Sequence, residues 1–344
     1  MGDEAVKIFF NAKGTLDDVR DELKAFLDYV AGKKPKDACV ERLEEAVKEA
    51  KKNREWRHEY MIQTNHKRGK WARQILDSRN GEGMWGDFHS LSQPTNKKEL
   101  TTEQAIRRLR VLGFTKEDEA IQIVLERMCL CVSGRKKIDD YSEKTHDWPL
   151  FERLMLSAWI RLFEPENRIA MEVARQWAYI VEKAFSSGQY NKNDDIEAFY
   201  EQFGRKPKSG FETGFGMFYH VALLQGVLNS ETEKLLLDYY ISRTEGIYYV
   251  YYKCLGKLPE TFASKETSHY LAAVEALADY QQAREKLGFV AKWLISNKNE
   301  CGSWDLGASV KDGVYFPLAD SWQRKELRIS DCTERISKLL QKIT

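Results

Sequence analysis

The sequence predicts an all-α protein: an α/α toroid of antiparallel helical hairpins, preceded by a charged N-terminal helical hairpin. Three observations support this fold class. Apolar residues recur at helical spacing along most of the chain, and only seven of the 344 residues are proline. A helix–turn–tryptophan motif occurs twice, at 75–85 and 293–304. Closing a ring of hairpins brings its ends together, so these positions favour a ring over a solenoid with a regular period.

The composition predicts a soluble, cytoplasmic protein. Lys and Arg total 54 against 53 Asp and Glu, so the formal net charge of +1 gives no overall field to attract nucleic acid, which we do not expect as a partner. The six cysteines form no CxxC pair, which favours a reducing compartment. No apolar run is long enough for a membrane span, and the first residues lack the pattern of a signal peptide.

The first predicted domain, 1–62, is a hairpin of two helices. Residues 16–31 carry apolar side chains at helical spacing, and Gly32 ends the segment. The second helix, 37–60, has a narrow apolar face and a densely charged face. A hairpin of this kind suits the docking of a protein partner better than catalysis.

Three stretches of this hairpin, IFFNAKG, DELKAFLDYVAG and KKNREWRHEYM, resemble the C-terminal tail of the recombination-promoting nuclease and transposase family. That family has a PD-(D/E)xK nuclease core, and the resemblance implies that only the tail is shared. The catalytic carboxylates and lysine of the core are not in this segment, so no nuclease activity is expected. The alternative is a generic charged hairpin.

The second predicted domain, 63–344, consists of paired helices. Thr101 or Thr102 is expected to cap one helix, and Ser230 with Glu233 reads as a capping box. A tyrosine-rich helix is expected from Gly246, although the run that follows is ambiguous between helix and strand. The other predicted helices cover 63–76, 102–112, 116–131, 149–163, 167–185, 194–203, 218–228, 230–242, 268–281, 284–297 and 332–343.

The two turn motifs carry a second resemblance. The first reads IL…N…GMW over 75–85, and the second reads WL…K…GSW over 293–304. They resemble the QW turns of the squalene/terpene cyclase and protein prenyltransferase superfamily, with Asn80 and Lys298 where that family has glutamine. The tail WDLGASVKDGVYFPLADSW, followed by ELRISDC, resembles a group of bacterial proteins of this fold. From about residue 70 onwards, the resemblance implies an α/α toroid that acts on or binds an apolar, isoprenoid-like ligand in a central cavity.

The candidate catalytic residues follow the two turns. Class II terpene cyclases protonate their substrate through a DxDD motif, which this sequence lacks. The remaining candidates are Asp87 and His89 after the first turn and Asp305 and Asp312 after the second. Ring closure would bring both sets to one sector, where they could supply an acid and a base. Alternatively, these polar residues form a salt-bridged clasp that needs no substrate.

Aromatic residues are the candidate ligand-binding groups. An aromatic wall can bind a polyprenyl chain or stabilise a carbocation through its π faces. The alternative is that these rings only pack between helix layers. The candidates are Trp85, Trp148, Tyr219, Tyr248, Tyr251, Trp304 and Trp322.

The sequence predicts no bound metal. Asp331 and Cys332 could form a zinc site only with a distant histidine, and adjacent helical residues project about 100° apart. The DDxxE run at 139–143 and the acidic residues at 193–201 loosely resemble the magnesium sites of class I terpene synthases. Such carboxylates could bind Mg²⁺ with a diphosphate ligand, but solvated helix ends are the simpler interpretation.

Two classes of function therefore remain open. One is an enzyme related to terpene cyclases and prenyltransferases. The other is a non-catalytic scaffold that docks a protein or nucleic-acid partner. An aromatic-lined pocket with a buried carboxylate would favour the enzyme. A plugged ring, or a continuous basic patch at 66–73, would favour the scaffold.

Overall fold

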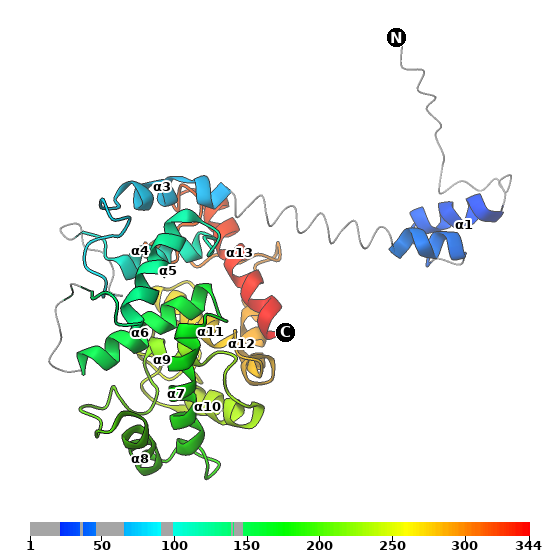
Figure 1. Ribbon diagram of the computed structural model, residues 1–344. Helices are drawn as coiled ribbons and strands as arrows, with labels where there is room; N and C mark the ends of the chain where they lie inside the picture. The colour runs from blue at the N-terminus through cyan, green and yellow to red at the C-terminus, as the bar shows by residue number, and fades with distance from the viewer. Residues whose placement is uncertain (1–20, 35–36, 46–64, 91–98, 139, 141–146) are drawn as a thin grey trace. The chain divides into compact units, whose positions relative to one another are not determined.

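The computed structural model describes residues 21–34, 37–45, 65–90, 99–138, 140 and 147–344 (Figure 1). The chain divides into two compact units after Asn65, whereas the sequence places the boundary after Ile62. The first unit contains α1 (Asp21–Val30) and a helical stretch at 38–45. The rest of the two predicted N-terminal helices lies outside the described residues.

Apolar side chains of the first unit are exposed to solvent. Phe26 and Val30 of α1 are 38% and 58% exposed, and Leu43 of the second helical stretch is 37% exposed. The described part of this hairpin therefore leaves large apolar groups uncovered.

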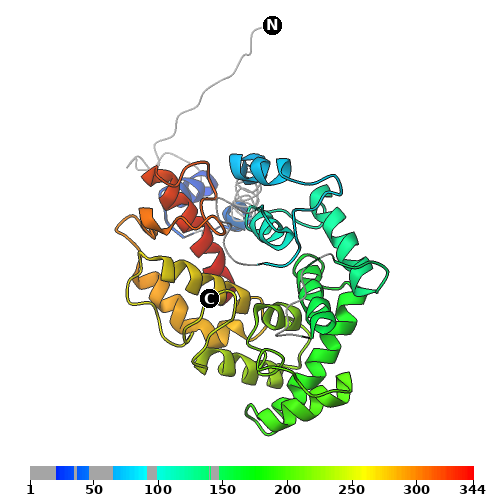
Figure 2. The same ribbon diagram turned by 90° about the vertical axis from the view of Figure 1, so that its left-hand side faces the viewer.

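The second unit is built from helices joined by turns and loops. Its described residues form no β-strand, only two isolated bridges, which confirms the all-α class. In Figure 2 the helices follow one another in chain order around the unit, from α3 to α13. None of the helices in the described residues is both long and apolar enough to cross a bilayer. The elements are α3 (Lys70–Asp77), α4 (Thr102–Val111), α5 (Glu119–Val132), α6 (Trp148–Phe163), α7 (Arg168–Ala184), α8 (Lys192–Phe203), α9 (Phe218–Leu224), α10 (Ser230–Ser242), α11 (Lys265–Leu277), α12 (Ala283–Ser296), the 3₁₀ turn η1 (Ala308–Val310) and α13 (Lys325–Ile343).

Capping side chains explain where two of these helices begin. Thr101 caps α4: its hydroxyl accepts from the N–H of Gln104 at 3.3 Å, and the Gln104 side chain accepts from the N–H of Thr101 at 3.2 Å. The predicted capping box at Ser230 is wrong, because Asn229 is the N-cap of α10. Glu233 instead accepts from the backbone N–H of the N-cap of α12 at 2.8 Å.

Two other predicted boundaries are displaced. Helix α5 begins at Glu119 and not at Lys116, because the side chain of Asp118 accepts from the N–H of Thr115 at 2.7 Å and holds a turn. Helix α13 begins at Lys325, seven residues before the predicted start at Cys332. Its first turns are rich in charged residues, so they lack the apolar periodicity that marks a buried helix face.

The tyrosine-rich segment at 246–252 is not a helix, contrary to the prediction. The N–H of Ile247 donates to the carbonyl of Tyr251 at 2.8 Å, so the chain folds back on itself. Gly246 has φ +61°, and a Cβ there would lie 2.4 Å from the carbonyl oxygen of Tyr251. Tyr249 takes φ +74°, which is uncommon for a residue other than glycine. Aromatic and β-branched residues favour such extended pairing over helix.

Packing between neighbouring helices forms a continuous core in the second unit. Helix α6 contacts α5, α7 and α9, α7 contacts α8, and α12 contacts α13. Aromatic side chains contribute much of the buried volume, and each buries a large apolar area. The bulkiest of the fully buried ones are Trp85, Trp159, Trp177, Trp322, Tyr219, Tyr240, Tyr270, Phe199, Phe215 and Phe316.

The two turn motifs share one geometry. In each, the indole N–H donates at 2.7 Å to a helix carbonyl ten residues earlier: Trp85 to Ile75 and Trp304 to Leu294. The chain thus doubles back, and the indole satisfies a carbonyl at the C-terminal end of the preceding helix. Each indole is anchored to its own helix.

An asparagine organises each turn. The side chain of Asn80 accepts from the N–H groups of residues 82 and 84, both at 3.0 Å. Asn299 does the same for residues 301 and 303, at 3.0 and 2.9 Å. The counterpart of Asn80 is therefore Asn299 and not Lys298, which the sequence comparison had paired with it. Lys298 lies over the indole of Trp304, with its Nζ 4.9 Å from the ring centre.

The beginning and end of the second unit are in contact. The indole N–H of Trp71 in α3 donates to the carbonyl of Ala319 at 2.9 Å. The imidazole Nε2 of His66 lies 3.0 Å from a carboxylate oxygen of Glu334 in α13. These bonds join segments more than 240 residues apart in sequence.

A second set of bonds joins α4 to the loop before α13. Arg108 donates to the carbonyl of Val314 at 3.0 Å and also to the carbonyl of Pro317. Asp331 in α13 accepts from the N–H of Leu318 at 3.0 Å and so fixes the same loop. Burial raises the pKa of Asp331 to about 6. The loop at 311–320 is therefore held between both ends of the unit.

Candidate functional site

A buried carboxylate lies at the centre of the site. Glu103, in the first turn of α4, has no exposed surface, and its carboxylate accepts three hydrogen bonds. Its Oε1 accepts from the indole N–H of Trp159 at 2.5 Å and from the hydroxyl of Tyr219 at 2.9 Å. Its Oε2 accepts from Nδ1 of His89 at 3.0 Å. The network brings together residues from a loop and from α4, α6 and α9.

Aromatic rings surround His89. The imidazole packs edge to face against Phe151 and Tyr249, with distances between ring centres of 5.1 and 5.9 Å. Trp148 lies 6.0 Å away in a similar arrangement. Phe151 and the side chain of His89 are largely buried, whereas Trp148 and Tyr249 are half-buried. The cluster therefore has buried polar groups, Glu103 and His89, and a partly accessible aromatic rim that includes Trp148 and Tyr249.

Backbone contacts hold His89 in place. The carboxylate of Asp140 accepts from the N–H groups of Phe88 and His89, each at 2.6 Å. Burial is the main reason that the pKa of Asp140 is raised, although these two bonds oppose the shift. The hydroxyl of Thr102 donates to the carbonyl of Trp85 at 2.7 Å and ties the same loop to α4. Asp140 is the only described residue of the DDxxE run, and it serves here as a backbone clamp.

The arrangement fixes the chemistry available to His89. A carboxylate can only accept from Nδ1, so Glu103 selects the tautomer in which Nδ1 carries a proton. Nε2 is then the ring nitrogen that can accept a hydrogen bond. Burial and the nearby carboxylate of Glu103 raise the pKa of Tyr219 well above its ordinary value, so its hydroxyl stays protonated. The pair His89–Glu103 has the geometry of a general base with its orienting group.

Two of the predicted aspartates, Asp305 and Asp312, lie in the segment before α13 and have structural partners. Asp305 forms a two-bond ion pair with Arg328, at 2.8 and 2.9 Å, and this pairing lowers the pKa of Asp305. Asp312 accepts from the N–H groups of residues 314–316 and from the hydroxyl of Ser268 at 2.9 Å. Asp87 is exposed. Of the four predicted catalytic residues, only His89 joins the aromatic cluster.

The predicted aromatic residues divide into groups. Trp148 and Tyr219 lie at the His89 cluster, and Tyr248 continues it through Tyr249, at 4.2 Å between ring centres. Tyr251 packs against Tyr270 on α11, at 5.4 Å between ring centres. The indoles at 85 and 304 bind their own helices, and that of Trp322 donates to the carbonyls of residues 307 and 308.

Sequence reasoning missed Glu103 and Trp159. An acidic residue in the first turn of a helix is ordinary, because it favours the helix dipole. The partners of Glu103 lie 56 and 116 positions away in sequence, so no local pattern connects them. The available signal was Trp159 itself, because a tryptophan in the apolar stretch 154–160 of α6 needs a partner for its indole N–H.

Among the described residues, no group of three or more His, Cys, Asp or Glu side chains is arranged to hold a metal ion. Asp331 accepts from backbone N–H groups, and the Cys332 thiol is buried with a pKa raised to about 12. From the second acidic run, Glu201 accepts from the hydroxyl of Tyr179 at 2.7 Å. These groups therefore have structural roles in the described residues.

His220, beside Tyr219, is a buried histidine with both ring nitrogens unpaired in the described part of the chain. It is fully buried, and its ring packs edge to face on Trp177 at 4.5 Å between ring centres. Burial, reinforced by Arg243, lowers the pKa of His220 to about 3. The imidazole is therefore neutral at physiological pH.

Replacing His220 by phenylalanine is expected to stabilise the protein by about 1 kcal/mol at neutral pH, because burying an unpaired imidazole is unfavourable. The native pKa lies below the unfolded value, so the stability that depends on neutral His220 is lost as pH falls below about 6.5. At about pH 5 the advantage of His220→Phe should grow by about 2 kcal/mol. Urea unfolding at both pH values measures this, and an advantage independent of pH would contradict the assignment.

Comparison with protein-family models, with curated proteins and with solved structures finds no match to this chain. The two resemblances drawn from the sequence therefore stay predictions.

Proposed function

We propose that the second unit is an α/α toroid and that it binds an apolar, isoprenoid-like ligand at the aromatic rim around His89. The observation that carries the proposal is the convergence of Trp148, Phe151, Tyr219 and Tyr249 on one imidazole. Aromatic faces suit an apolar chain or a positive charge that develops on it. The imidazole of His89, oriented by Glu103, would lie against that chain as the one group able to exchange a proton.

Two further features support the toroid. The indole-to-carbonyl bond recurs with the same length in both turn motifs. The ends of the unit meet through Trp71 and the loop at 311–320. Ring closure of hairpins requires such contact between the first and last elements, whereas an open solenoid does not.

Binding of prenyl compounds tests the proposal. The full chain is incubated with farnesyl and geranylgeranyl diphosphate and with the matching alcohols, and complexes are measured by native mass spectrometry. We expect one ligand per chain, and Trp148→Ala should weaken binding about tenfold, since a half-buried tryptophan is a typical binding anchor. Trp293→Ala is the matched control, because Trp293 is also half-buried but packs against Phe262 and Tyr270.

Catalysis is tested separately by product analysis with gas chromatography and mass spectrometry. His89→Gln should keep ligand binding and abolish any product, because glutamine retains a polar side chain but cannot exchange a proton. Absence of binding for all the prenyl compounds would overturn the proposed function. If Trp148→Ala and Trp293→Ala weakened ligand binding equally, the proposed location of the binding site would be overturned.

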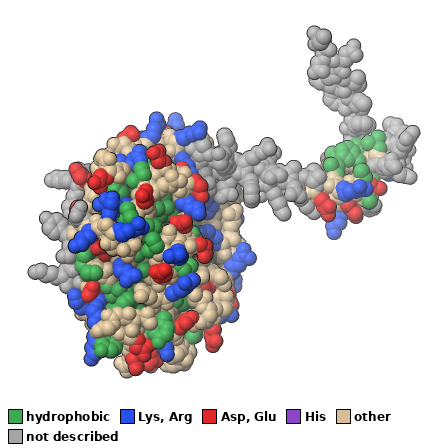
Figure 3. Space-filling model, in the orientation of Figure 1, with side chains coloured by type: hydrophobic (Ala, Val, Ile, Leu, Met, Phe, Trp, Pro, Cys, Tyr) green, Lys and Arg blue, Asp and Glu red, His purple; other side chains and the backbone are tan. Residues whose placement is uncertain are grey.

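A scaffold is the second candidate, favoured by the exposed apolar side chains of the first unit, Phe26, Val30 and Leu43. In the second unit, the basic segment after Asn65 is partly neutralised, since Lys67 pairs with Asp118 at 2.7 Å. Figure 3 shows charges of both signs interspersed over the face in view. These features favour a protein partner over nucleic acid. Copurification of a protein with the full chain, and its loss in Phe26→Asp, would support this candidate.

A further inference from the structure

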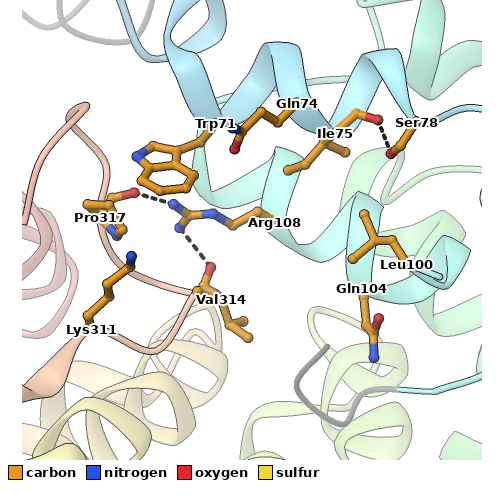
Figure 4. A pocket seen from close by; sticks show the side chains of 11 residues that line it. Trp71, Gln74, Ile75, Ser78, Leu100, Gln104, Arg108, Lys311, Val314 and Pro317 are labelled. Atoms are coloured by element: carbon orange, nitrogen blue, oxygen red, sulfur yellow. Dashed lines mark hydrogen bonds between the residues drawn. The ribbon is translucent and has the colours of Figure 1, made fainter. Parts of the chain in front are cut away.

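A pocket of about 240 Å³ lies where the two ends of the second unit meet, separate from the His89 cluster. Helices α3 and α4 form one side of it, and the loop at 311–317 forms the other (Figure 4). Its volume is slightly below that of pockets for drug-sized ligands, so it suits a smaller molecule. The lining residues are Trp71, Gln74, Ile75, Ser78, Leu100, Gln104, Arg108, Lys311, Gly313, Val314 and Pro317.

The lining is asymmetric in its chemistry. In Figure 4, Trp71, Arg108 and Lys311 lie towards one end, and Ile75 and Leu100 lie towards the other. Among the described residues, the pocket lining includes two cations and no carboxylate. One end of the pocket is therefore cationic, and the other combines the apolar Ile75 and Leu100 with the uncharged polar Ser78 and Gln104.

The two cations differ in their surroundings. Arg108 is bonded to two loop carbonyls and is buried, which lowers its pKa to about 10, so it remains charged at neutral pH. The carboxylates of Asp312 and Asp331 partly balance its charge. Lys311 is exposed and forms no ion pair with a described residue, and its Nζ lies 5.2 Å from the ring centre of Trp71. Lys311 is thus the cation that can reach an incoming anion.

We propose that this pocket binds a small amphipathic carboxylate, with its anionic group at Lys311 and its apolar body between Trp71, Ile75 and Leu100. A lysine on a flexible stem pairs readily with a carboxylate at a rim. The bound molecule would contact both ends of the unit and thereby strengthen their closure. Ligand binding to the folded state alone raises its stability by mass action.

Calorimetry with 2-naphthoate tests the site, and the neutral 2-naphthylmethanol separates charge from apolar contact. We expect 2-naphthoate to bind the full chain with a Kd of about 1 mM or tighter. Lys311→Gln should weaken it about threefold to fivefold, the range for one partly exposed ion pair. The neutral compound should bind the wild type more weakly and should be insensitive to Lys311→Gln.

Two further variants locate the binding. Lys298→Gln is the matched control, because Lys298 lies over the indole of Trp304 in the same way but outside the pocket. It should bind 2-naphthoate like the wild type. Gln74→Trp, at an exposed position of α3 that lines the pocket, should fill the space and abolish binding. Binding that survives Gln74→Trp, equal affinity for the neutral compound, or no binding to the wild type would overturn the proposal.

Discussion

Replacing Glu103 by alanine is expected to lower the free energy of unfolding of the second unit by about 3–5 kcal/mol. The change would leave the indole N–H of Trp159, the hydroxyl of Tyr219 and the imidazole of His89 without their common acceptor. Unpaired polar groups in a site that excludes water are strongly unfavourable. Urea unfolding followed by circular dichroism and tryptophan fluorescence measures the loss.

Glu103→Gln separates the hydrogen bonds from the charge. Its amide oxygen can still accept from Trp159 and Tyr219, so we expect a loss of about 1 kcal/mol. The amide nitrogen cannot accept from Nδ1 of His89, so the tautomer of the imidazole should change. If Glu103→Ala lowered the free energy of unfolding no more than Glu103→Gln, the buried network would contribute little to stability.

Local signals predicted most of the helices. Apolar spacing and the cap Thr101 are encoded within a few residues, so α4, α6 and α7 begin and end close to their predicted bounds. Asn167, which the prediction places inside a helix, is the N-cap of α7. The failure at 246–252 has a physical reason, because the extended pairing of Ile247 with Tyr251 depends on a glycine at φ +61°. A run of tyrosines does not encode which of these conformations the fold imposes.

The candidate site was harder to predict than the fold. His89, Trp148 and Tyr219 were selected as separate candidates and lie in one cluster, whereas the acid was sought at Asp305 and Asp312. The ion pair of Asp305 and the bond from Ser268 to Asp312 join residues 23 and 44 positions apart. Nothing local distinguishes an aspartate that caps a loop from one that donates a proton. The two roles differ in which groups surround the carboxylate, and that arrangement exists only in the folded protein.

Arg335 is expected to show the second large effect, because it joins α13 to α11. Its guanidinium donates to both carboxylate oxygens of Glu275, at 2.6 and 3.0 Å, and to the hydroxyl and carbonyl of Ser268, each at 3.0 Å. It also stacks on Tyr315, 4.5 Å from the ring centre. Arg335→Ala should therefore destabilise the unit by about 3–5 kcal/mol, the range for breaking a buried pair.

Arg335→Lys keeps the charge but cannot form the planar fork, so it should recover only part of the lost stability. Arg284→Ala is the matched control, since Arg284 also bonds to α13, but through weak, exposed contacts of 3.4 and 3.5 Å to two carbonyls. It should change the free energy of unfolding by less than about 0.5 kcal/mol. If the end of the chain were held mainly by surface contacts, Arg284→Ala would match Arg335→Ala in urea unfolding. A large difference between them would instead show that the buried contacts of Arg335 hold α13 against α11.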